Sequence, residues 1–293
     1  LVDYCTEWYM QNDPEHLLEL SNGKKKLPLI DKKDILTKCI YGVDIDVHAV
    51  EVSKFSLLIK LIEDETPASV KECVPILPDL SSNIKNGNSL ICREDIHGKE
   101  LPIEVLCNIK PFEWETINGG AKFDAIVGNP PYVKTEDIHT LETEEEFAVY
   151  KKKYKSAYKQ FDKYFLFLEE AFNLLKENGQ MCYIVPNKFY KIGAGQELRR
   201  ITAKHVSKLD DFGDMQLFPD KTIYSCIITL CKESSKQMEY TNVTSLIDLW
   251  TGEEQESIRI KNELLDENPW RLTTDIKFMK MIATVEENGK PLG

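Results

Sequence analysis

The sequence lacks the patterns that mark membrane, secreted and metal-binding proteins. No apolar run approaches the ~18 residues that a membrane-spanning helix needs. The first 20 residues carry five acidic side chains, which excludes a secretory signal peptide. The eight cysteines form no Cys-x-x-Cys pair and the five histidines are scattered, so we expect neither a disulfide framework nor a metal site. This cysteine usage predicts reduced thiols in a cytoplasmic protein.

Positive charge is also scarce over the whole chain. The net charge of −12 argues against a nucleic-acid-binding protein if the 293 residues are taken together. Residues 147–210, however, contain 11 Lys and 2 Arg against 6 acidic residues. A basic face on an acidic protein can still follow phosphates, although a solvated, lysine-rich helix explains the same composition. The length and the 42% apolar content fit one large α/β domain with an appendage.

The most informative stretch is residues 123–132, Phe-Asp-Ala-Ile-Val-Gly-Asn-Pro-Pro-Tyr. Its continuous apolar run predicts a central parallel strand, from Phe123 to Val127, that is covered on both faces. Gly128 ends the strand, and two prolines then fix φ and remove two backbone donors. The carboxyl end of a strand is where open α/β sheets bind ligands. We therefore expect a ligand site at this turn.

The residue types of the turn suit a planar group that carries an NH2. The Asn129 side-chain oxygen and the Pro130 carbonyl can accept both amino hydrogens, while the Tyr132 ring stacks on the face of the group. Accepting both hydrogens moves the nitrogen toward the geometry of an attacking nucleophile, and preorganised acceptors are a large catalytic factor. The alternative is a proline-stiffened loop with a packed tyrosine and no chemistry.

Asn-Pro-Pro-Tyr after such a strand resembles the catalytic motif of the gamma-class N6-adenine DNA methyltransferases, as in type IIG restriction-modification enzymes. The resemblance covers about residues 40–232. It implies a Rossmann-like fold of the α/β class that uses S-adenosylmethionine, with a mostly parallel sheet and a C-terminal antiparallel strand. It also implies methyl transfer to N6 of an adenine flipped out of double-stranded DNA, catalysed by Asn129, Pro130, Pro131 and Tyr132, without a metal.

The cofactor residues are expected at two further strand ends. Asp44 follows the strand Cys39–Val43, in the position where α/β folds hold ribose hydroxyls, and Asp46 is the expected N-cap of a helix over 47–63. The resemblance implies that Asp44 binds the cofactor ribose and that Ile45 packs on its adenine. Asn88 and Ser89, in the turn after a short strand, match the family position that contacts the adenine, with Asn129 as a further contact.

The second half of the expected core supplies the DNA contacts. Phe218, which precedes Pro219 in a loop before the strand Ser225–Leu230, matches the aromatic residue that stacks on the flipped adenine. Lys188 and Lys221 are the expected DNA-binding lysines. For Phe218 the alternative is a core side chain before a hairpin.

A glycine-rich turn after the first strand, where backbone approaches the cofactor closely, is missing. We therefore predict an amino-terminally truncated chain, with a partial catalytic domain at 1–233 and a segment at 234–293 that leads to a target recognition domain outside it. Any DNA cleavage would belong to missing sequence. Two other interpretations stay open: a protein-glutamine N-methyltransferase, which shares Asn-Pro-Pro-Tyr, and a non-catalytic DNA-binding remnant.

Overall fold

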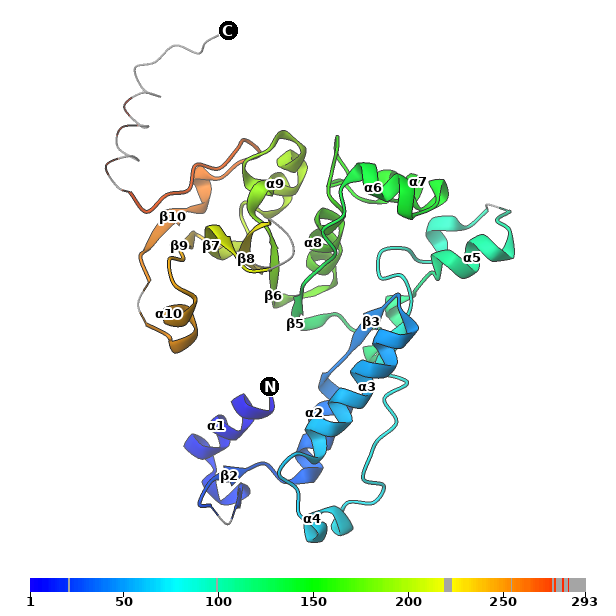
Figure 1. Cartoon of the computed structure of the whole chain (residues 1–293), viewed down its shortest axis with the longest axis vertical. Helices are drawn as coiled ribbons and strands as arrows, with labels where there is room; N and C mark the ends of the chain where they lie inside the picture. The colour runs from blue at the N-terminus through cyan, green and yellow to red at the C-terminus, as the bar shows by residue number, and fades with distance from the viewer. Residues whose placement is uncertain are drawn as a thin grey trace. The chain divides into compact units, whose positions relative to one another are not determined.

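The computed structural model describes residues 1–275, except 21, 99, 219–222 and 254, together with residues 277, 281 and 284. The chain divides into two compact units, Leu1–Ala121 and Lys122–Gly293 (Figure 1). Each unit buries its own set of apolar side chains. No helix of the described ranges is long and apolar enough to cross a membrane.

The first unit consists of short helices around small sheets. Its helices are α1 (Val2–Asn12), α2 (Leu29–Cys39), α3 (Val47–Ile62), α4 (Pro67–Glu72) and α5 (Ile103–Ile109), with the 3-10 turns η1 (Pro14–His16), η2 (Glu94–Ile96), η3 (Trp114–Thr116) and η4 (Asn118–Gly120). Its strands are β1 (Leu18–Glu19), β2 (Lys25–Lys26), β3 (Gly42–Asp44) and β4 (Ile84–Asn86). β1 pairs with β2 antiparallel and β3 pairs with β4 parallel.

Helix α3 follows β3 as the sequence predicts. The Asp46 side chain accepts a hydrogen bond from the His48 backbone N–H at 2.8 Å, which confirms the expected N-cap. Val50 and Leu61 of this helix are buried, whereas Phe55 remains 65% exposed. The buried cluster of this unit draws on α2, α3, the loop before β4, and β4 itself: Leu29, Leu36, Val50, Leu61, Leu80 and Ile84.

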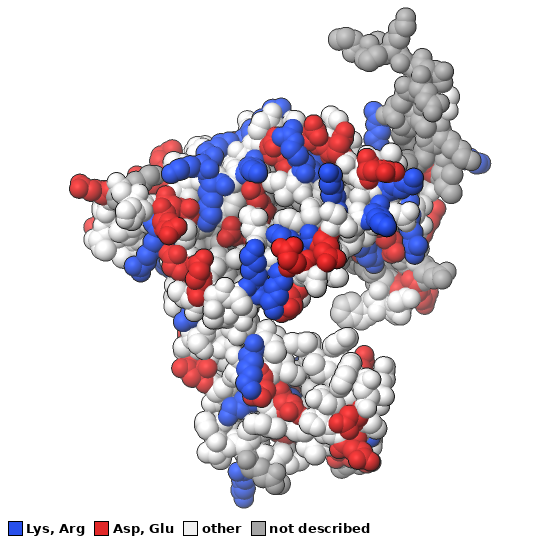
Figure 2. Space-filling model, turned by 180° about the vertical axis from the view of Figure 1, so that it is seen from behind, with Lys and Arg blue, Asp and Glu red and all other residues white. Residues whose placement is uncertain are grey.

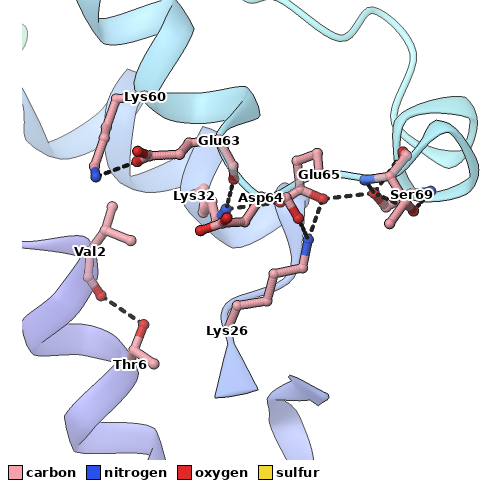
Figure 3. Close-up of polar contacts among 10 residues, drawn as sticks. Val2, Thr6, Lys26, Lys32, Lys60, Glu63, Asp64, Glu65 and Ser69 are labelled. Atoms are coloured by element: carbon pink, nitrogen blue, oxygen red, sulfur yellow. Dashed lines mark hydrogen bonds and ion pairs between the residues drawn. The ribbon is translucent and has the colours of Figure 1, made fainter. Parts of the chain in front are cut away.

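A charged cluster fixes the connection between α3 and α4 (Figure 3). The Glu65 carboxylate is 1% exposed, and it pairs with Lys26 of β2 at 2.6 Å and with Lys32 of α2 at 2.8 Å. The Ser69 hydroxyl donates a third hydrogen bond at 2.7 Å. Burial acts to raise the pKa of Glu65, but the three hydrogen bonds outweigh it and hold the pKa below its ordinary value.

The second unit is built on one larger sheet. Its strands are β5 (Phe123–Gly128), β6 (Leu175–Pro186), β7 (Val206–Gln216), β8 (Tyr224–Cys231), β9 (Gln237–Asn242) and β10 (Ser257–Lys261). Its helices are α6 (Thr135–Leu141), α7 (Glu144–Lys153), α8 (Lys163–Leu174), α9 (Gln196–Thr202) and α10 (Leu246–Thr251), with the 3-10 turns η5 (Asn187–Tyr190), η6 (Gly193–Gly195) and η7 (Asn262–Leu264).

The strand order of this sheet is β10-β9-β7-β8-β6-β5. β5 and β6 are parallel, and β8 runs antiparallel to both β6 and β7, so β6 and β7 point the same way. β9 is parallel to β7 and β10 reverses again. Four of the six strands therefore share one direction, and the predicted antiparallel strand is β8, inserted between β6 and β7. The predicted fold class, a Rossmann-like methyltransferase fold, is confirmed.

The expectation that the strand from Phe123 is covered on both faces is wrong for this unit. β5 is hydrogen-bonded only to β6 among the described strands, so it lies at the edge of the sheet. As a result Val127 is 80% exposed. The apolar run that suggested a central strand correctly predicted a parallel strand, but periodicity does not reveal how many neighbours that strand has.

The region beyond residue 233 extends this sheet through β9 and β10. The chain after β10 then contacts η5 and α9. There the Trp270 backbone N–H donates to the Tyr190 carbonyl at 2.8 Å. The buried Arg199 guanidinium donates to the carbonyls of Phe189 and Glu267. These bonds fix η5, which directly follows β6. The boundary at residue 233 and the recognition domain beyond the chain stay predictions.

Candidate active site

The turn after β5 leaves two hydrogen-bond acceptors unused. Asn129 is exposed, and within the described residues neither its side-chain amide nor the Pro130 carbonyl has a hydrogen-bond partner. Gly128 precedes them where a Cβ would lie 2.9 Å from the Tyr183 ring. A glycine is therefore needed for β5 to lie this close to β6. Pro130 is buried and Pro131 exposed, so the pair fixes the turn from both sides.

Tyr132 is held in place by β6 and α8. Its hydroxyl donates to the Ile184 carbonyl at 3.0 Å, and its ring meets the Tyr164 ring edge-on at 6.2 Å. The Tyr164 hydroxyl in turn donates to the Pro186 carbonyl at 3.1 Å. Burial raises the pKa of Tyr132 to about 12, with a smaller contribution from Cys226. The phenol therefore stays protonated at neutral pH, and the ring has one fixed orientation.

The structure brings Phe218 next to Tyr132. The two ring centroids are 6.2 Å apart with an interplanar angle of 72°. Residues from the loops after β5 and β7, 86 positions apart in sequence, thus form one aromatic cluster. Lys221 and Pro219 lie outside the described residues. The aromatic pair and the free acceptors of the turn belong to the same unit.

Lys188 has an ionic partner inside the protein. Its ammonium lies 2.8 Å from the carboxylate of Asp162, a side chain that is almost completely buried. Burial raises the pKa of Asp162, and Lys188 opposes this shift. The Lys163 backbone N–H donates to the Val133 carbonyl at 2.8 Å. Asp162 and its neighbour thus link the segment after Tyr132 to the turn after β6, a role that sequence reasoning did not assign.

A second group of residues that sequence reasoning missed lies behind this turn. The buried Asp211 carboxylate accepts hydrogen bonds from the Asn187 amide at 2.8 Å, from the Tyr240 hydroxyl at 3.3 Å, and from the Tyr190 hydroxyl. Burial and the nearby Asp211 charge raise the pKa of Tyr190. The network ties η5 to β7 and β9. Its partners are too far apart in sequence for any local pattern to show them.

In the first unit the predicted cofactor residues gather at one edge. Asp44 and Asn86 are partners at the carboxyl ends of β3 and β4. The Asn86 amide donates to the carbonyls of Asp44 and Ile45, both at 3.0 Å, and the Lys110 ammonium donates to the Ile45 carbonyl at 2.9 Å. One Asp44 oxygen accepts the Asp46 N–H at 2.8 Å. The Asp44 and Ile45 side chains are exposed, and their backbone is fixed.

Asn88 and Ser89 continue this edge after β4. Asn88 is buried, and its side-chain oxygen accepts the Leu90 N–H at 3.1 Å. The Ser89 carbonyl accepts the Trp114 indole N–H at 3.0 Å. Gly87 just before them would place a Cβ 2.8 Å from Phe112. The turn is thus closely packed, and Asn88 serves the turn itself through its side-chain oxygen.

The second unit provides acceptors for an amino group and a pair of aromatic rings, and the first unit provides an exposed carboxylate beside an exposed apolar side chain. No group of three or more potential metal ligands occurs among the residues that the structure describes. The groups of the second unit can position a polar planar group, and those of the first can bind a hydroxyl-bearing ligand.

The fold is of the Rossmann-like α/β class, and the family match identifies a methylase. Residues 38–218 match the family described as Eco57I restriction-modification methylase, and the chain belongs to this family. It is 40% identical over 299 aligned residues to the type II restriction enzyme and methyltransferase RM.Eco57I of Escherichia coli. That match covers 100% of this chain but 29% of the relative, so the chain spans less than a third of that protein's length.

One further relative and one solved structure also match this chain over a small part of their own length. The putative type II restriction enzyme and methyltransferase RM.MjaORFECS2P of Methanocaldococcus jannaschii is 38% identical over 27% of this chain and 7% of its own length. Among solved structures, a nuclease-deletion mutant of the Type ISP restriction-modification enzyme LlaGI, in complex with a DNA substrate mimic, aligns with a TM-score of 0.59. It is 15% identical and the alignment covers 95% of this chain and 24% of that one, which supports the fold.

Proposed function

We propose that this protein is a site-specific DNA adenine methyltransferase of a restriction-modification system. It transfers a methyl group from S-adenosylmethionine to N6 of an adenine that is flipped out of double-stranded DNA. Any DNA cleavage would reside outside residues 1–293. The eight free cysteines fit the reducing cytoplasm as its compartment.

One observation carries the proposal: the unused acceptors of Asn129 and Pro130 lie in the same turn as Tyr132, whose ring meets Phe218. An amino group needs two acceptors, and a base taken out of the duplex needs aromatic surface. The two oxygens would accept both N6 hydrogens, and Pro131 keeps the turn rigid. The fixed Tyr132 ring and Phe218 would then contact the base.

The Tyr132–Phe218 pair also favours a base over a smaller substrate. A glutamine side chain has no ring, so an amide substrate would gain little from two aromatic residues at the acceptor turn. A flat purine has a ring that can pack against aromatic side chains. This observation ranks DNA ahead of protein glutamine as the substrate.

The edge of β3 and β4 fits the cofactor. One carboxylate oxygen of Asp44 accepts the Asp46 N–H, and the other can accept a hydrogen bond from a ribose hydroxyl. The exposed Ile45 side chain beside it can pack on an adenine ring. Asn88 and Ser89 would line the same edge, and the cofactor contact predicted for Asn129 stays a prediction. When bound, the cofactor supplies an activated methyl group on a sulfonium, so the protein needs no strong general base. Binding and orientation are the tasks of these side chains.

Lys188 and Lys221 are the proposed DNA contacts. Lys188 is 38% exposed and already neutralised by Asp162, so we expect it to position the turn after β6 as well as meet a phosphate. A phosphate contact of this kind adds affinity without sequence information.

The test is the fate of a labelled methyl group. The protein in its full natural length is incubated with S-adenosylmethionine labelled in the methyl group, unmethylated duplex DNA and a protein extract, and the DNA is digested to nucleosides. Label in N6-methyldeoxyadenosine is the expected result. Label on cytosine or on a protein glutamine, or no label in spite of DNA binding, would contradict the proposal, and the last outcome would favour a non-catalytic DNA-binding protein.

A further inference from the structure

The second half of α7 and the loop that follows it, residues 154–160, carry an unusual local charge. Residues 147–160 contain five lysines and no acidic residue, in a chain of net charge −12. Figure 2 shows basic and acidic side chains side by side on the face seen from behind, so the net charge does not describe each local surface. The helix dipole accounts for the lysines in the last turn of α7, Lys151 to Lys153. It does not account for Lys155 and Lys159, which lie beyond the helix.

Side chains of α7 and α8 hold the backbone of this loop. The Lys151 ammonium donates to the carbonyls of Ala157 at 2.9 Å and Lys159 at 3.2 Å. Burial lowers the pKa of Lys151. From α8, the buried Glu169 carboxylate accepts the backbone N–H groups of Lys155 at 3.1 Å and Ser156 at 2.8 Å. The Lys151 ammonium from α7 and the Glu169 carboxylate from α8 thus fix the backbone of the loop.

Three lysine side chains then point to solvent with no acid to neutralise them. Lys152, Lys155 and Lys159 are exposed, and none of them forms an ion pair with a residue that the structure describes. The Lys159 ammonium lies 4.9 Å from the centre of the half-buried Tyr158 ring. A fixed backbone that presents unpaired ammonium groups is typical of a surface that meets an anionic partner.

The loop leads into residues that are bonded to the segment after the turn Gly128–Tyr132. Its last residue, Gln160, is followed by Phe161, whose carbonyl accepts a hydrogen bond from the Thr135 hydroxyl. Lys134 and Asp162 form an isolated antiparallel bridge. The basic loop therefore ends directly before Phe161 and Asp162, and these two residues are bonded to the segment that follows Asn-Pro-Pro-Tyr. This attachment favours DNA as the partner. If a duplex places a flipped base at the turn Gly128–Tyr132, the phosphates next to that base lie beside the segment that follows the turn.

We propose that Lys152, Lys155 and Lys159, with Tyr158 at their side, form a docking face for the phosphate backbone of the DNA duplex. The inference rests on the proposed function, since it names a second contact of the same substrate. The face contributes sequence-independent affinity, because it presents ammonium groups and no fork that could read base edges.

The experiment is the salt dependence of duplex binding, measured by fluorescence anisotropy with the protein in its full natural length. The triple variant Lys152→Gln, Lys155→Gln, Lys159→Gln removes the three charges. A second triple variant, Lys204→Gln, Lys236→Gln, Lys261→Gln, removes three exposed charges elsewhere in the same unit. Each phosphate contact adds about 0.9 to the slope of log K against log salt. We expect the first variant to lower the slope by roughly 2 to 3 and the second to leave it unchanged.

The double variant Lys155→Gln, Lys159→Gln separates the docking face from the helix dipole. It leaves α7 intact and should lower the slope by roughly 2. At saturating DNA we expect both docking variants to keep the wild-type kcat and to raise KM for DNA. An unchanged slope and KM would overturn the inference, as would an equal decrease of the slope in the control triple variant. Weaker binding of an acidic protein by the docking variants, with unchanged binding of DNA, would overturn it as well.

The outcomes distinguish this inference from the proposed function. A reduced slope in an enzyme that labels no adenine would support the docking face and contradict the function. Normal adenine labelling with an unchanged slope would leave the function standing and overturn the docking face. A wild-type protein that binds no duplex would contradict both.

Discussion

The two units hold their candidate site residues in different ways. In Leu1–Ala121, hydrogen bonds from Asn86 and Lys110 fix the backbone at Asp44 and Ile45, and the side chains stay exposed. In Lys122–Gly293, Tyr132 itself is fixed, through its hydroxyl and two ring contacts. The first arrangement presents groups that a ligand can meet without repacking, and the second sets the orientation of a ring. Substitutions in the first unit should thus act on ligand affinity, and those in the second also on the position of the turn.

Their stabilising polar clusters differ as well. The first unit uses a salt-bridged carboxylate, Glu65, between two lysines. The second uses a carboxylate, Asp211, whose side-chain partners are an amide and two phenols. Each cluster can be removed separately, which provides a direct test of whether the two units are stabilised independently.

The largest effect is expected from Asp211→Ala. The substitution leaves the buried donors of Asn187, Tyr190 and Tyr240 without their acceptor, so we expect a loss of about 3 to 5 kcal/mol in the free energy of unfolding. Hydrogen exchange should rise in β7 and η5 but not in α2. The exposed neighbour Asp214 provides the control, since Asp214→Ala should leave stability unchanged. Equal exchange increases in both units would contradict independent stabilisation.

Glu65→Gln should produce the converse result. It leaves two partly buried ammonium groups without a counter-charge, at a cost of about 2 to 4 kcal/mol, and exchange should rise in α2 and β2 but not in β7. The exposed pair of Lys38 and Asp34 offers the control, because Asp34→Asn should cost little.

The same carboxylate predicts a pH dependence for the first unit. Because the pKa of Glu65 is lower in the folded protein than its ordinary value of 4.5, its contribution is complete above that value. The contribution is lost as the pH falls below 4.5 and through the folded pKa. Denaturant titrations of the wild type and of Glu65→Gln should therefore converge as the pH falls. Parallel curves down to the acid limit would contradict the assignment.

Gly128→Ala tests how closely the acceptor turn depends on β6. The added Cβ would lie 2.9 Å from the Tyr183 ring, so we expect a loss of about 1 to 3 kcal/mol and a displaced turn with reduced methyl transfer. Gly193→Ala is the matched control, since nothing lies within 4 Å of its Cβ position. Thermal unfolding and kcat report the two effects separately.

A smaller effect is expected from Tyr132→Phe. The variant keeps the ring but removes the hydrogen bond to the Ile184 carbonyl, which should cost about 1 kcal/mol of stability. Tyr224→Phe, at an exposed tyrosine, should cost nothing measurable. A loss of activity without any loss of stability would show that the hydroxyl acts on the substrate instead of anchoring the ring to β6.

Much of the fold could be predicted from the sequence, because short apolar runs and an N-cap mark β5, β6, β8 and α3 locally. The acceptor turn was visible for the same reason, since Asn129 to Tyr132 are adjacent. The supports of the turn were not visible. Asp211 meets Asn187 from 24 positions away, and Asp162 meets Lys188 from 26, and neither separation leaves a periodic signal. The exposure of β5 depends on neighbouring strands, which no single segment encodes.

The most direct test of the central claim is single-turnover methyl transfer to duplex DNA by the wild type, Asn129→Ala and Asn173→Ala. Asn173 is an exposed asparagine on α8 and controls for the substitution itself. If the Asn129 amide accepts an N6 hydrogen, its removal should slow transfer by about 100- to 1,000-fold when cofactor and DNA are both saturating. The Asn173 variant should match the wild type. Transfer by Asn129→Ala at the wild-type rate would contradict the claim.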